Sequence, residues 1–192
     1  MTDVSTKVIT PEAMLSYPHL DKPQPGKKST DKQKYSCTLV YAPGTDISGL
    51  VAAANAAGEK KFPGRYAEML RLGQIKSPFR KDAEGKGYVD GSIFSNVRTE
   101  QQPGIVYSHA GPDGKPAKMP QEKIKDEMYP GAKVRASITF FGYDTDGNRG
   151  VSAALNNIQK IGEGTRLDGR SAPEDEFTAD LSKAPADLSG LI

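Results

Sequence analysis

The chain of 192 residues has no tryptophan, a single cysteine and only two histidines, and these scarcities limit its chemistry. Because Cys37 has no second cysteine to pair with, an internal disulfide is excluded and a reducing, cytoplasmic compartment is expected. No apolar run approaches the length of a membrane span. The first residues, MTDVSTKVIT, lack the basic start and apolar stretch of a secretory signal. We therefore expect a polar, soluble protein.

Signals for metal binding and catalysis are also lacking. The two histidines, His19 and His109, lie far apart in the sequence, and one cysteine gives no zinc-site spacing. The segment DTDGNRG begins like a calcium loop. However, Arg149 stands where that loop needs glycine, and Leu155 stands where it needs a bidentate glutamate. We therefore interpret DTDGN as a hairpin turn, and we expect no enzyme, no metal and no cofactor.

Charge is distributed unevenly along the chain. The net charge is +2, but the residues from Ser171 onward carry five acids and one base, a net of −4, which leaves +6 on residues 1–170. From about Gly162 the sequence is rich in Gly, Asp, Glu, Ser, Ala and Pro and lacks periodicity, which is typical of a disordered tail. The sequence therefore predicts a basic body followed by a flexible acidic tail.

Alternating apolar residues predict several strands, and one alanine-rich segment predicts a helix. The helix is expected over DISGLVAAANAAGEKKF, capped by Asp46 or Ser48, with a second short helix over GRYAEMLRL. Its apolar stripe is expected to comprise Leu50, Val51, Ala54 and Ala57. The expected strands lie in AMLSYPHL, KYSCTLVYA, SIFSNVRTE, GIVYSH and the segment from Gly131 to Ile161.

Long loops rich in glycine, proline and lysine separate these strands. The first, DKPQPGKKSTDKQ, contains Lys22, Lys27, Lys28 and Lys32 and is expected to be mobile and basic. Five or six strands with one good helix fit an antiparallel barrel or a sandwich, and a small OB-type barrel is one candidate. The pattern alone does not choose among these β folds.

The segment from Gly131 to Ile161 predicts a hairpin with an unusual outer face. Alternation favours Phe141 over Phe140 as the exposed ring, although a bulge near Gly142 would reverse that choice. The pattern places Val134, Ala136, Ile138 and Phe140 toward the core, and Arg135, Ser137, Thr139, Phe141 and Tyr143 toward solvent.

Cations and aromatic rings on outer strand positions are what nonspecific single-strand binding requires. Cations neutralise phosphates, and ring faces stack on bases. The ordinary alternative is that outer cations merely protect sheets from aggregation and that aromatic residues simply favour strands. The candidate DNA-binding residues are Phe94, Arg98, Lys133, Arg135, Phe141, Tyr143, Arg149 and Lys160.

The order of these segments resembles a family of phage-type single-stranded DNA-binding proteins with one OB-fold and an acidic C-terminal tail. The resemblance covers about residues 8–178. Its most specific part is YPGAKVRASI followed by GNRGVSAALNNIQK. The other segments that carry it are MLSYPHLDKP, KYSCTLVY, YVDGSIFSNVRTEQQPGIVY and SAPEDEF.

This resemblance implies a mainly β protein: a five-stranded antiparallel Greek-key OB barrel with long loops and one main helix. The barrel domain is expected over residues 1–165 and the flexible acidic tail over 166–192. Such a protein would coat single-stranded DNA during phage replication and recombination, in the host cytoplasm. Oligomers are possible. Replication or recombination proteins would dock on the tail through Glu174, Asp175, Glu176 and Phe177.

Two other functions fit the same residues. One is an OB-type module that binds RNA or a protein through its basic face. The other is a phage structural protein that uses the β framework for assembly, although mobile basic loops and an acidic tail are unnecessary for a static shell.

Overall fold

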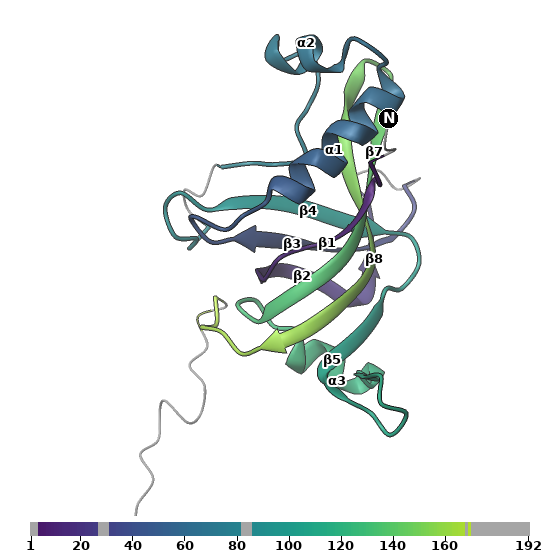
Figure 1. Cartoon of the computed structure of the whole chain (residues 1–192). Coiled ribbons are helices and arrows are strands. Elements are labelled where there is room, and N and C mark those ends of the chain that lie inside the picture. Colours follow the sequence, from purple (N-terminus) through teal and green to yellow (C-terminus); the bar gives the residue numbers. More distant parts are fainter. Residues whose placement is uncertain (1–3, 27–30, 82–85, 168, 170–192) are drawn as a thin grey trace, which may run out of the picture.

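Figure 1 shows the computed structural model of the chain, which describes residues 4–26, 31–81, 86–167 and 169. Within these residues the chain forms eight strands and three helices. The strands are β1 (Lys7–Ile9), β2 (Ala13–Gln24), β3 (Lys34–Tyr41), β4 (Ile93–Thr99), β5 (Gly104–Ala110), β6 (Pro116–Lys118), β7 (Lys133–Thr145) and β8 (Asn148–Gly162). The helices are α1 (Ser48–Lys61), α2 (Tyr66–Arg71) and α3 (Gln121–Glu127).

Five of the strands close into a barrel. Strand β2 pairs antiparallel with β3, and β3 with β4. Strand β4 then runs parallel to β8, β8 pairs antiparallel with β7, and β7 returns to β2. This connectivity is that of the OB-fold, so the predicted fold is confirmed. Strand β1 adds to the barrel beside β7, while β5 and β6 extend the sheet beyond β8.

Residue alternation in β7 builds one side of the core. Val134, Ala136, Ile138 and Phe140 are all buried, as the pattern predicts. Phe141 is 44% exposed. Its register continues without a shift, because Phe141 pairs with Ser152 and the next residue, Gly142, pairs with Val151. Phe141 is therefore the outward ring of the pair, as alternation indicates.

The β7–β8 hairpin ends in a two-residue turn at Asp146 and Gly147. Both residues have positive φ, 49° and 78°, which is the requirement of the type I′ turn that matches strand twist. The prediction of a hairpin turn at DTDGN is confirmed. Across the ladder beside the turn, Arg149 forms an ion pair with Asp144 at 2.9 Å between Nε and Oδ2.

Helix α1 lies across the hairpin (Figure 1). The N-cap residue is Ile47 rather than the predicted Asp46 or Ser48, and it makes no side-chain capping hydrogen bond. The Asp46 carboxylate accepts a hydrogen bond of 2.9 Å from the N–H of Ser48, the first helical residue. Its buried stripe comprises Leu50, Ala53, Ala54, Ala57 and Gly58. The prediction that Val51 belongs to this stripe is wrong, because Val51 is exposed. The residues that share the face of Leu50 are those three, four and seven positions after it.

Strand β2 contains a bulge that affects the surface described next. Ser16 pairs with Thr38 and His19 pairs with Ser36, so Tyr17 and Pro18 together face the single residue between those partners. Two residues facing one is the defining arrangement of a β-bulge. Pro18 has no N–H to donate to the ladder, which is consistent with an irregularity at this position.

Candidate nucleic-acid interface

A groove of about 940 Å³ lies over the outer face of β2, β3 and β4. It is bordered on one side by the connection between β2 and β3, and on the other by the end of β4. Its lining includes Tyr17, His19, Lys32, Lys34, Ser36, Thr38, Asn96, Arg98 and Glu100. We call this surface the groove.

Cations line the rim of the groove, and two of them share a carboxylate. Lys32 lies 2.8 Å and Lys34 lies 3.7 Å from Glu100, measured from ammonium nitrogen to carboxylate oxygen. The hydrogen bond between Lys32 and Glu100 raises the pKa of the lysine and lowers that of the glutamate. All three side chains are largely exposed, so these pairs contribute little to stability and their cations remain accessible to a phosphate.

The floor of the groove is polar and uncharged. Thr38 donates a hydrogen bond of 2.7 Å from its hydroxyl to the side-chain carbonyl of Asn96 on the neighbouring strand. Cys37 also borders the groove, but its side chain is buried in the core, and burial raises the pKa of its thiol to about 12. The thiol is therefore protonated and unreactive at neutral pH. The arrangement suits contact with a ligand rather than chemistry on one.

Phe94 does not face solvent as predicted, since it is only 3% exposed. Phe94 does lie on the outer face of β4, as alternation predicts, because Asn96 and Arg98 on the same face are exposed. However, Tyr88 packs edge-on against Phe94 with ring centroids 5.5 Å apart, and Lys86 lies 5.3 Å above the same ring. The loop before β4 thus covers this end of the outer face, and Phe94 belongs to a small second core.

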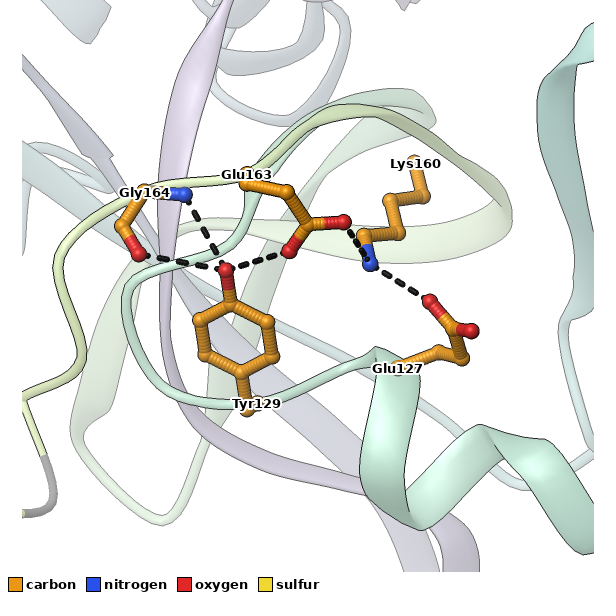
Figure 2. A network of polar contacts seen from close by, with 5 residues as sticks. All are labelled: Glu127, Tyr129, Lys160, Glu163 and Gly164. Carbon is orange, nitrogen blue, oxygen red and sulfur yellow. Dashed lines mark hydrogen bonds and ion pairs between the residues drawn. The ribbon is translucent and has the colours of Figure 1, made fainter. Parts of the chain in front are cut away.

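Lys160 is also buried, at 6% exposure, so its prediction as a surface cation is wrong. Figure 2 shows its ammonium between two carboxylates, 2.5 Å from Glu127 and 2.6 Å from Glu163. Burial alone would lower the pKa of Lys160, but these two hydrogen bonds outweigh it and raise the pKa above its ordinary value. Tyr129 donates a hydrogen bond of 2.5 Å to Glu163 and accepts one from the Gly164 N–H.

The five other predicted residues outside the groove lie on the β7–β8 hairpin. Phe141 is exposed, whereas Tyr143 is half-buried over Gly150, where a side-chain carbon would lie 2.8 Å from the tyrosine oxygen. Arg149 lies with Lys61 and Arg65 around a smaller pocket of about 200 Å³. The remaining two, Lys133 and Arg135, are exposed at the start of β7, and Lys133 lies 3.6 Å from the Glu12 carboxylate.

Of the eight predicted residues, Arg98 alone lines the groove. Tyr17 and His19 line the groove but are not among the predicted site residues, and Lys32 is predicted only as one of the loop lysines. A usable signal was present in the dipeptide Tyr17–Pro18, because a proline inside a strand indicates a bulge. A bulge shifts the alternation of every residue after it.

The predicted tail site, Glu174, Asp175, Glu176 and Phe177, lies outside the described residues, as do Lys27 and Lys28. Two residues just after position 165, Arg166 and Leu167, still pack against the barrel domain. The Arg166 guanidinium lies 4.2 Å from the centre of the Tyr129 ring, and the Leu167 N–H donates to the Pro130 carbonyl at 2.9 Å.

In the part of the chain that the structure describes, no helix has the length and apolar character to cross a membrane. No group of three or more His, Cys, Asp or Glu side chains among these residues is arranged to hold a metal ion.

A closed five-stranded barrel with cations and a ring beside an open groove is the architecture of OB-fold proteins that bind single-stranded nucleic acid. The family described as the single-stranded DNA-binding protein of Enterobacter phage Enc34 matches residues 6–188, and the chain belongs to this family. Among curated proteins, "Putative protein p50" of Acyrthosiphon pisum secondary endosymbiont phage 1 is 28% identical over 110 residues. That match covers 54% of this chain and 53% of the relative, so the chain spans about half of the relative's length.

Two solved structures have a similar fold. The single-stranded DNA-binding protein of bacteriophage Enc34, in complex with single-stranded DNA, matches with a TM-score of 0.66 at 18% identity, covering 84% of this chain and 89% of that one. Gp2.5, a single-stranded DNA-binding protein encoded by bacteriophage T7, matches with a TM-score of 0.59 at 14% identity, covering 86% and 97%. At these identities the likeness extends to the fold.

Proposed function

We propose that this protein binds single-stranded DNA along the groove, with little dependence on base sequence. The observation that carries the proposal is the position of the groove. It lies over the strands β2, β3 and β4 of the barrel and brings Lys32, Lys34 and Arg98 beside a polar floor and an exposed aromatic ring. Membership of a family of phage single-stranded DNA-binding proteins supports the same reading.

The chemistry of the groove explains why binding would depend little on sequence. Lysine and arginine side chains contact phosphates, which every nucleotide carries, and stacking on a ring is available to every base. Bound protein lowers the free energy of the unpaired strand and so opposes hairpin formation and reannealing. The exposed residues of the hairpin, Arg135, Phe141 and Arg149, would extend this path with further cations and a second ring.

The test is a competition measured by fluorescence anisotropy of a labelled oligo(dT). Unlabelled single-stranded DNA should displace the probe at much lower concentration than duplex DNA of equal length or RNA. A preference for duplex DNA or for RNA would contradict the proposal and favour an RNA-binding module. Large stable assemblies that form without DNA would favour a structural protein instead.

We further propose that the protein coats unpaired DNA during phage replication and recombination in the host cytoplasm. It would act without a catalytic step or a cofactor and pass the strand to polymerases, exonucleases or annealing proteins. These partners would dock on Glu174, Asp175, Glu176 and Phe177 in an acidic tail spanning 166–192, tethered to a barrel domain spanning 1–165. The charge difference along the sequence supports this division.

The tail is expected to compete with DNA, because a tethered anion can occupy a basic groove weakly. Deleting residues 171–192 removes five acids and one base, and should raise affinity for oligo(dT) at low salt more than at high salt. Binding isotherms at two salt concentrations measure the effect. Unchanged or weaker binding by the truncated protein would count against competition.

A further inference from the structure

Tyr17 has an unusual backbone conformation and an exposed ring. Its φ is +44°, in the left-handed region that residues other than glycine and asparagine seldom adopt. Its side chain is nevertheless 59% exposed, so burial of the ring does little to offset the backbone strain. Strain of this kind persists where the surrounding structure imposes it, and such residues cluster at functional sites.

The bulge in β2 imposes this conformation and also sets the direction of the ring. Strict alternation from Leu15, which is fully buried, would turn Tyr17 toward the core. The bulge at Tyr17 and Pro18 interrupts that alternation, so that Tyr17 is exposed and Leu20 returns to the core. Bulges re-aim side chains in this way beside binding sites.

The ring is placed in the groove, among groups suited to a nucleotide. Tyr17 and His19 line the groove with Ser36 and Arg98 from the neighbouring strands. Among the described residues that line the groove, Tyr17 is the single tyrosine or phenylalanine, because the candidate ring of Phe94 is buried under Tyr88. A base stacked on Tyr17 would leave its phosphates within the cationic rim formed by Lys32, Lys34 and Arg98.

We propose that Tyr17 is the stacking platform of the groove, and that the strained bulge exists to present its ring to a base of the bound strand. This inference rests on the proposed binding of single-stranded DNA and identifies the residue on which it depends. It requires that strain at this position serve binding rather than folding.

The first test replaces Tyr17 with asparagine, which tolerates the left-handed conformation but has no ring. The variant Tyr17→Asn should bind oligo(dT) about 5- to 140-fold more weakly, the range expected for loss of one stacked base. Its melting temperature should equal or exceed that of the original protein, because the strain is relieved. Affinity within about twofold of the original would overturn the proposal, and so would a fall in melting temperature that accompanies the loss of affinity.

The second test uses Tyr17→Phe, which keeps an aromatic ring for stacking but removes the tyrosine fluorescence of this position. Because the chain has no tryptophan, its intrinsic fluorescence comes from its eight tyrosines, and a tyrosine stacked on a base is quenched. Tyr17→Phe should bind oligo(dT) within about twofold of the original protein but show a smaller fractional quench at saturation. An unchanged quench would place the stacking elsewhere and overturn the proposal.

A control separates this inference from the proposed function itself. Leu72→Asn removes another exposed apolar side chain that does not line the groove, and it should leave affinity and quench unchanged. Failure of the original protein to bind oligo(dT) would contradict the proposed function. Normal binding by the original protein and by Tyr17→Asn alike would contradict only the role of Tyr17.

Discussion

At the scale of single residues, Arg98 and Lys160 are both cations on barrel strands, but one is exposed and the other is buried. Arg98 is exposed on β4 and lines the groove. Lys160 is enclosed by Glu127 from α3 and by Glu163, the residue after β8 (Figure 2). A buried cation held by two carboxylates fixes the position of the elements that carry them, so Lys160 connects the end of the barrel to α3.

Removing Lys160 should therefore affect stability and not binding. Lys160→Ala leaves two carboxylates near each other without their shared cation, and we expect it to lower the free energy of unfolding by about 2 kcal/mol. Urea denaturation measures this loss. Lys133→Ala is the matched control, because its exposed ion pair with Glu12 should contribute less than about 0.5 kcal/mol. A Lys160→Ala variant of normal stability and weakened DNA binding would restore the original surface assignment.

At the scale of elements, strand alternation predicted the two faces of β7, but not what covers the outer face of β4. Alternation is a local property, and it correctly separated Phe140 from Phe141. The burial of Phe94 depends on Tyr88, which packs against Phe94 on β4 and donates a hydrogen bond of 2.9 Å to Ser16 on β2. Tyr88 and Ser16 are 72 positions apart, and a contact over that distance leaves no periodic signal in either segment.

The candidate site was predicted less well than the fold for the same physical reason. The groove is formed by β2, β3, β4 and the β2–β3 connection, so the set of residues that line it depends on how the barrel closes. Outer cations and rings can be predicted only strand by strand, and most of the predicted ones lie on the β7–β8 hairpin. The bulge at Tyr17 and Pro18 also interrupts the alternation of side chains in β2, which places Tyr17 on the surface.

The hairpin remains testable as a second DNA contact. Phe141 is exposed, so Phe141→Ala should leave the melting temperature unchanged while lowering affinity for oligo(dT) by about 1–3 kcal/mol. Thermal unfolding and anisotropy titrations measure the two quantities. Tyr143→Ala is a useful comparison, because Tyr143 packs over Gly150 and its loss should also destabilise the hairpin. Normal affinity of Phe141→Ala would confine binding to the groove.

At the scale of the whole molecule, the barrel carries a long insertion between β3 and β4. Residues 42–92 contain α1 and α2, which lie beside the β7–β8 hairpin (Figure 1). They also contain Tyr88, which covers one end of the outer face. This insertion leaves the other end of that face open as the groove. The basic charge of residues 1–170 and the acidic charge after them then suggest a body that attracts phosphates and a tail that opposes them.

The central claim is that cations of the groove neutralise phosphates of a single strand, and the salt dependence of binding tests it most directly. With Lys32, Lys34 and Arg98 contributing, the logarithm of the oligo(dT) association constant should fall with the logarithm of salt concentration with a slope of about −2 or steeper. Arg98→Ala should weaken binding to all sequences alike and reduce the slope by about 0.7. A slope near zero, or one that Arg98→Ala leaves unchanged, would contradict the claim.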